Sequence, residues 1–243
     1  MESPIRVSPK LMLVQRLISQ IDGQVSAVNR RMLEIAVLFA VALSGWTLIA
    51  TDEISASQTL LQSDWSLVAR PFFEAITDLF LYVFYLLFAG LLVVGFVAQQ
   101  ALLRGLAWRY LVAQLIGSVV VVRVLKMLLG RGRPNSDLPG QFTGEWGAWT
   151  LDAGFHAMPS GHSADVFTGA VLLALVLKSG GLRLLLLASA VLAGFSRVAV
   201  AAHWPSDVLV GGLIGSCCAL ALGLGAFAST FCLEANHLVS LTT

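Results

Sequence analysis

The chain has 243 residues, of which 57% are hydrophobic and only 12% are charged. A soluble globular domain carries about 25% charged residues, so this composition excludes an ordinary soluble enzyme, a nucleic-acid-binding domain and a disordered chain. The formal net charge of +1 provides no overall positive field that would attract nucleic acid. A mean hydropathy of +0.83 instead indicates a membrane protein.

The first predicted element is an amphipathic helix over residues 11–28. Apolar side chains recur there at helical spacing, while Gln15, Arg16 and Gln20 interrupt the apolar run. This pattern is typical of a helix that lies on the inner membrane surface and is too interrupted for the apolar core of a signal peptide. We therefore expect a cytoplasmic amphipathic segment over 1–32, a single membrane domain over 33–229 and a cytoplasmic tail over 230–243.

Six apolar stretches follow, and a membrane-spanning helix needs about 20 mostly apolar residues. The fold class that we expect is therefore an all-α integral membrane bundle of six transmembrane helices, with the amphipathic helix at the interface. The predicted spans are about 33–50, 79–99, 109–129, 163–178, 183–201 and 207–229. In the last of these, the spacing of Gly211 and Gly215 predicts close helix packing.

Lys and Arg in the short flanks predict the orientation of the spans, because such residues favour the cytoplasmic side. If the chain begins in the cytoplasm, the positive flanking residues share one side: Arg6, Lys10, Arg16, Arg30, Arg31, Arg104, Arg109, Lys178 and Arg183. We therefore expect both termini inside, and loops 51–78, 130–162 and 202–206 outside. The compact chain favours a bacterial inner membrane, with the site facing the periplasm.

Ionisable groups inside membrane spans are costly and usually indicate function. This topology gathers several of them at the outer end of the bundle: Lys126, Arg131, Arg133, His162, Arg197, His203 and Asp207. Lys and Arg donors match the oxygens of a phosphate, and the segment Pro159-Ser160-Gly161-His162, which immediately precedes a helix, adds backbone N–H groups. Two histidines can divide the roles of nucleophile and general acid, and Asp207 is close enough along the chain to fix the tautomer of His203.

Metal-assisted hydrolysis is not expected, because the nearby carboxylates lack a paired spacing such as D-x-D. No G-x-x-x-x-G-K-[ST] loop indicates nucleotide use either. We therefore expect neither a metal nor another cofactor. The roles of two cations stay open. Arg123 either contacts the substrate or pairs with a buried group, and Arg131 binds either at the phosphate site or to lipid headgroups. For Asp165, the start of a helix explains the carboxylate better than a role in orienting His162.

Three motifs in this group resemble the type 2 phosphatidic acid phosphatase superfamily: Lys126-x6-Arg133-Pro134, Pro159-Ser160-Gly161-His162 and Ser196-Arg197-x5-His203-x3-Asp207. The resemblance implies that His203 attacks phosphorus and forms a phosphohistidine, that Asp207 orients His203, and that His162 protonates the leaving alkoxide. It also implies, without a metal cofactor, a set of groups that hold the phosphoryl oxygens: Lys126, Arg133, Arg197, Ser160 and the Gly161 backbone.

These observations predict an integral membrane phosphatase that acts on a lipid phosphate or lipid pyrophosphate at the outer leaflet. Four substrates stay open: undecaprenyl pyrophosphate, phosphatidylglycerophosphate, phosphatidic acid and the phosphate of lipid A. Selectivity among them is expected in loops 51–78 and 135–158. The expected partners are this substrate and membrane lipids, with no nucleic acid. The alternatives are phosphate transfer from one lipid to another and a protein that only binds or transports lipid phosphate.

Overall fold

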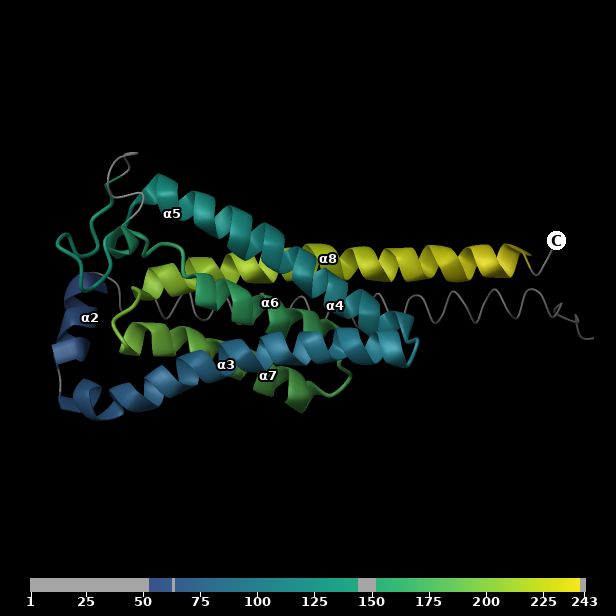
Figure 1. Ribbon diagram of the computed structural model, residues 1–243, viewed down its shortest axis with the longest axis horizontal. Helices are drawn as coiled ribbons and strands as arrows, with labels where there is room; N and C mark the ends of the chain where they lie inside the picture. The colour runs from purple at the N-terminus through teal and green to yellow at the C-terminus, as the bar shows by residue number, and fades with distance from the viewer. Residues whose placement is uncertain (1–52, 63, 144–151, 241–243) are drawn as a thin grey trace, which may run out of the picture. The chain divides into compact units, whose positions relative to one another are not determined.

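The computed structural model describes residues 53–62, 64–143 and 152–240, so the predicted amphipathic segment and the first predicted span lie outside the described residues. Every element longer than one turn in the described part is a helix (Figure 1). The other five predicted spans coincide with helices: α3 (Asp64–Val97), the continuous run of α4 (Ala101–Gln114), η1 (Leu115–Val122) and α5 (Arg123–Leu129), then α6 (Gly161–Val176), α7 (Gly180–Ala199) and α8 (Pro205–Ser240). The all-helical class is thus confirmed.

Four described segments are long and apolar enough to cross a membrane: Val68–Val97, Ala101–Leu129, Gly180–Ala199 and Pro205–Gly223. The helix of the fourth predicted span, α6, has only 16 residues. It is nevertheless the core of the bundle, because it packs against α8, α7, α3 and α4 and its side chains are buried from Thr168 to Leu175. A helix enclosed by other helices does not need the length of one that faces lipid on most sides.

The described residues of the predicted outer loop 51–78 are helical. They form α2 (Glu53–Gln62) and the first part of α3, which begins at Asp64 rather than near residue 79. An exposed i,i+4 ion pair joins Arg70 and Glu74 at 3.0 Å in this extension. Helical structure therefore continues past the apolar stretch from which the span was predicted.

Two glycines of α8 allow it to approach α6 closely, as their spacing predicts. A Cβ atom at Gly211 would overlap the backbone oxygen of Ser160, and one at Gly215 would overlap that of Ala164. The hydroxyl of Thr168 bonds the carbonyl oxygens of Ala164 at 2.8 Å and Gly215 at 3.2 Å, which links the two helices. This contact fixes the start of α6 against the start of α8.

A π-helix, η1, interrupts the third predicted span. Residues Gln114, Ser118, Val122 and Lys126 recur at every fourth position, and all four line one pocket. In an α-helix this spacing drifts by about 40° per step, or about 120° from first to last. A π-helix pairs residue i with i+5 and therefore has a wider turn, which offsets the drift. The wider turn keeps the four side chains on one face.

The segment after α5 turns sharply at Gly130, which has a φ of 53° and ends the helix in the left-handed conformation. The chain then folds back on itself, with an isolated bridge between Arg131 and Phe142. In Figure 1 this segment lies at the end of the bundle that also carries α2, the start of α6 and the start of α8. We refer to this as the α2 end.

Candidate active site

The junction of α7 and α8 brings Arg197, His203 and Asp207 together through two local backbone motifs. Ala202 N donates to Arg197 O at 3.0 Å and Ala201 N to Val198 O at 2.9 Å, which is a Schellman ending of α7. The position that usually holds glycine is occupied by Ala201, with a φ of 58°. His203 follows at once, and its N–H also donates to Arg197 O at 3.2 Å.

The second motif starts α8. Trp204 precedes the helix, Pro205 takes its first position, and the Asp207 carboxylate returns to accept the Trp204 N–H at 2.8 Å. This is the reciprocal bond of a capping box, and proline is favoured at the first helical position because it needs no N–H partner there. The spacing Ser196-Arg197-x5-His203-x3-Asp207 is therefore set by two motifs in succession, the ending of α7 and the start of α8.

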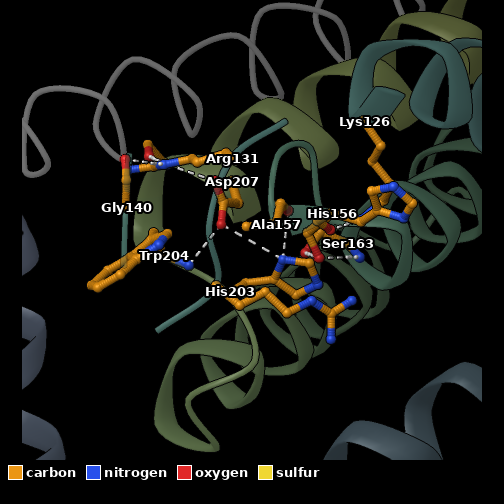
Figure 2. A network of polar contacts seen from close by, with 12 residues as sticks. Lys126, Arg131, Gly140, His156, Ala157, Ser163, His203, Trp204 and Asp207 are labelled. Carbon is orange, nitrogen blue, oxygen red and sulfur yellow. Dashed lines mark hydrogen bonds and ion pairs between the residues drawn. The ribbon is translucent and has the colours of Figure 1, made fainter. Parts of the chain in front are cut away.

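His203 is held in one tautomer by a carbonyl group (Figure 2). Its Nδ1 lies 2.7 Å from Ala157 O, and because a carbonyl oxygen can only accept, Nδ1 carries the proton. The other ring nitrogen, Nε2, is then unprotonated. Burial lowers the pKa of His203 to about 4, against the opposing effect of Asp207. His203 is thus neutral at pH 7, which is the state that a nucleophile requires.

Asp207 has no measurable exposure, and its carboxylate is shared among several groups. Its Oδ2 lies 3.6 Å from His203 Nδ1, which is too long for a hydrogen bond, so it acts on the imidazole through its charge. Its Oδ1 accepts from Arg131 Nη1 at 2.6 Å. Arg131 also pairs with Glu53 of α2, and Glu53 accepts from the hydroxyl of Ser206 at 2.9 Å. The negative charge of Asp207 is therefore balanced by a buried arginine.

His203 opens onto a cavity of about 460 Å³ whose walls carry four cations, Arg123, Lys126, Arg133 and Arg197. The arginine side chains form neither a hydrogen bond nor an ion pair within the described part of the chain, and Nε of both Arg133 and Arg197 is buried without a partner. Buried donors in a native protein are almost always satisfied, so orphaned ones indicate a missing acceptor. A cavity with several such cations and few counter-charges suits an anion with several oxygens.

His162 and the backbone of Gly161 line the same cavity at the first turn of α6. Ser160 has a different place. It is fully buried, and its side-chain oxygen caps α6 by accepting from Ser163 N at 3.4 Å and Ser163 Oγ at 3.0 Å. Its own N–H donates to Asp207 O at 2.9 Å. Ser160 therefore holds the start of α6 against α8 and does not line the cavity.

The short segment before α6 is held from two sides. Lys126 Nζ donates to His156 O at 2.5 Å, and His203 donates to the next carbonyl, that of Ala157 (Figure 2). An ammonium group has three hydrogens, so this bond positions Lys126 and leaves others for the cavity. The positions of Lys126 and His203 are thus fixed relative to each other, although Lys126 lies on α5 and His203 lies in the junction between α7 and α8.

Most of the predicted site residues come together in this cavity: His203, His162, Lys126, Arg133, Arg197, Gly161 and Arg123 line it. Asp207 lies behind His203, as its sequence position suggested. Arg131, which the sequence left open, has its contacts on Asp207, Glu53 and Ser206, away from the cavity wall. The physical reason is the turn at Gly130, after which the chain folds back toward Phe142.

The sequence did not identify several residues of this region. Glu53 and the Ala157 carbonyl are joined to the site only by the tertiary fold, and no local pattern marks them. Trp204 could have been found, since Trp-Pro-x-Asp is the signature of a capped helix start. Polar residues within apolar spans also line the cavity: Tyr85, Gln114 and Ser118.

Comparisons with known proteins agree with this geometry. A model of the PAP2 superfamily matches residues 106–230. The chain is 35% identical over 113 residues to "Lipid A 1-phosphatase" of Rhizobium etli, which is 46% of this chain and 47% of that protein. It is 46% identical over 61 residues to "Undecaprenyl-diphosphatase" of Sulfolobus acidocaldarius, which is 25% of this chain and 29% of that protein.

The chain thus matches about half or less of the length of these curated relatives. Among solved structures, the crystal structure of Aquifex aeolicus LpxE is 25% identical, with 64% of this chain and 85% of that chain covered and a TM-score of 0.46. The family model extends over the whole third predicted span, 109–129, and over all three motifs. The chain therefore belongs to the PAP2 superfamily and is an integral membrane protein with several membrane-spanning helices.

Proposed function

We propose that this protein hydrolyses a lipid phosphate or lipid pyrophosphate through a phosphohistidine on His203, without a metal ion. The observation that carries the proposal is the state of His203: it is neutral, it is fixed in one tautomer by Ala157 O, and it faces a cavity that is lined by four cations. An anion-binding site alone needs the cations but does not need such an imidazole. The cations also repel a metal ion, so phosphate binding by Arg and Lys is the simpler chemistry.

In the first step, His203 Nε2 attacks phosphorus, the N–P bond forms, and the P–O bond to the lipid breaks. His162 gives its proton to the leaving oxygen. In the second step, water attacks phosphorus, His162 accepts a proton from it, and the N–P bond breaks to release phosphate. Lys126, Arg133, Arg197 and the Gly161 N–H stabilise the negative oxygens in both steps. Asp207 stabilises the charge on the imidazole, and Ser160 supports the helix start that carries Gly161 and His162.

The relatives support a lipid substrate, because their names specify lipid A and undecaprenyl diphosphate. Phosphatidylglycerophosphate and phosphatidic acid present the same phosphoryl group and remain alternatives. We further propose six spans, both termini in the cytoplasm, and a site that faces the periplasm of a bacterial inner membrane. Under this topology the α2 end is the outer end, and the lipid tail reaches the site from the bilayer.

The test is phosphate release by the detergent-purified protein from a panel of these lipids, with EDTA present. Parent activity should survive EDTA, and His203→Ala should lose it by about 10⁴-fold or more. An aryl phosphate sharpens the assignment, since its good leaving group needs no proton. His162→Ala should retain much of its activity on the aryl phosphate but lose it on the lipid, whereas His203→Ala should lose both.

The phosphohistidine itself can be trapped by rapid quenching with labelled substrate at alkaline pH. Label should remain on the parent and not on His203→Ala. Label that forms but leaves only when a second lipid is added would favour a phosphotransferase. Lipid binding without release, by a folded preparation, would favour a binding or transport protein. Activity that EDTA abolishes and a divalent ion restores would contradict the metal-free mechanism.

A further inference from the structure

The cavity has a second wall that the phosphate chemistry does not use. Tyr85 of α3, Gln114 at the end of α4, Ser118 of η1 and Asp165 of α6 all line it. These polar groups lie within apolar spans, and Asp165 is the only carboxylate among the described residues of the cavity wall. Polar and ionisable groups at such positions are costly, so their convergence on one cavity indicates a use.

The four residues form one connected network. Tyr85 Oη donates to Asp165 Oδ2 at 2.7 Å, Gln114 Nε2 donates to Asp165 O at 3.2 Å, and Ser118 Oγ donates to Gln114 Oε1 at 3.1 Å. The network retains capacity for a ligand, because an amide nitrogen has two hydrogens and a carboxyl group accepts several bonds. Tyr85 is also supported by an edge contact with Tyr110, whose ring stacks on Phe88.

The position of Asp165 indicates that this wall lies near the leaving group. Asp165 follows His162 by three residues on α6, so the two side chains share a face about one turn apart. In an in-line displacement, the leaving oxygen lies opposite the attacking His203 and beside the acid, His162. The organic group bonded to that oxygen therefore passes His162 and reaches the wall of Tyr85, Gln114, Ser118 and Asp165.

We propose that Tyr85, Gln114, Ser118 and Asp165 form a leaving-group subsite, which binds a neutral alcohol that carries hydroxyl or amide groups, such as the glycerol or sugar unit of a lipid phosphate. This inference rests on the proposed function. A plain hydrocarbon alcohol would remove these polar groups from water and offer nothing to their remaining donor and acceptor capacity, which is costly. A second phosphate would bring its acceptor oxygens against the acceptor oxygens of Asp165.

The test compares two substrates with the same chain and the same phosphate in detergent micelles: ether-linked hexadecyl glycerophosphate, whose glycerol has a free hydroxyl, and hexadecyl phosphate. The parent should hydrolyse the glycerol compound with a kcat/KM at least about tenfold higher. Tyr85→Phe and Asp165→Ala should each lower this value by about fivefold or more, and change hexadecyl phosphate by less than about twofold. Two variants are used so that a folding defect in one does not decide the result.

Tyr82→Phe is the matched control. It removes the same hydroxyl from an exposed residue one turn earlier in α3, outside the cavity, and should change neither substrate. Equal hydrolysis of both substrates by the parent, or an equal fall for both in Tyr85→Phe, would overturn the subsite and leave the phosphatase intact. Release from neither substrate, nor from the lipid panel above, would overturn the proposed function and the subsite with it.

Discussion

Two sides of the site are built in different ways. On one side, Arg197, His203 and Asp207 belong to a single segment, 197–207, and bonds between near neighbours in the chain set their geometry. On the other side, each contact joins distant parts of the chain: Arg131 meets Asp207 76 residues away, and Lys126 meets His156 30 residues away. The first side is an assembly of helix-end motifs, and the second depends on the whole bundle.

This difference predicts how each side responds to change. A local motif is stabilised by backbone bonds, so most single substitutions should leave its shape intact. A long-range contact fails when either partner is removed, and both its stability and its effect on the site are lost together. The following predictions test this contrast, from the largest expected effect to the smallest.

Arg131→Met should have the largest effect on stability, because it leaves the buried Asp207 charge without its cation. Breaking a buried pair in this way costs about 3–5 kcal/mol. Without Arg131, the charge of Asp207 would also act more strongly on His203 and raise the pKa of His203. The acid limb of the pH–rate profile should therefore move to higher pH. Chemical unfolding in detergent and a pH–rate profile measure the two effects.

The control is Arg70→Met, which removes an exposed i,i+4 pair with Glu74 and should change stability by less than about 0.5 kcal/mol. If the two variants were equally stable, Arg131 would not be the link between α2 and the site. Arg131→Lys should restore part of the stability, since it keeps the charge but not the forked geometry.

Gly215→Ala should cost about 1–3 kcal/mol, because its Cβ would overlap Ala164 O and force α6 away from α8. The separation of His162 and His203 depends on this contact, so activity should fall as well. Gly90→Ala is the matched control: a Cβ there meets nothing within 4 Å, and alanine is the better helix former. Thermal unfolding should separate the two variants, and a Gly215→Ala protein as stable as the parent would contradict the close approach.

The pH dependence tests the lowered pKa of His203, which burial brings to about 4. As the pH falls below this value, the imidazole becomes protonated and kcat/KM should fall about tenfold per pH unit, after correction for ionisation of the substrate phosphate. The profile should be bell-shaped, since His162 must give a proton. An acid limb centred near 6.5 would show that His203 is not desolvated in the free enzyme.

The same shift has a consequence for stability. The pKa of His203 in the folded protein lies below the value of about 6.5 for an unfolded imidazole. The unfolded chain therefore binds the proton more tightly. The contribution of neutral His203 to stability is present above pH 6.5 and is lost as the pH falls toward 4.

Ala201→Gly should have the smallest effect, and a favourable one. Ala201 has a φ of 58°, a conformation that costs a residue with a Cβ about 1–2 kcal/mol relative to glycine. Part of this gain is offset because glycine is more flexible in the unfolded chain. A rise in the melting temperature with unchanged kcat would agree with a junction that local bonds determine. A loss of activity would instead show that the alanine methyl group supports the site.

The local side of the site was largely predictable from the sequence, and the long-range side was not. The sequence placed His203, Asp207 and Arg197 together because their spacing is short, and it placed Lys126, Arg133 and His162 near them through the topology. It assigned Ser160 to phosphate, whereas the structure has it as the cap of α6. The partners of Arg131 could not be predicted, because Glu53 and Asp207 are brought to it only by the packing of α2 against the bundle.

The span predictions differed for a similar physical reason. Hydropathy located the apolar part of each helix, but α3 begins earlier, where polar residues continue the helix. Hydropathy also treated 109–129 as a uniform span, although residues 115–122 within it form a π-helix. A period of four among Gln114, Ser118, Val122 and Lys126 was visible in the sequence. Its meaning depended on knowing that all four face one cavity.

The π-helix also affects how this protein should be aligned with its relatives. A π turn holds more residues than an α turn, so a related span that is α-helical throughout would need a gap within 115–122 to bring both of its ends into register. An ungapped alignment would match Lys126 to its structural equivalent and place Gln114 out of register, or it would match Gln114 and place Lys126 out of register. Deletion of one residue from this segment should likewise keep the span helical while rotating one end by about 100° relative to the other. In this segment, a change in length of one residue therefore changes the direction in which the side chains at one end of the span point.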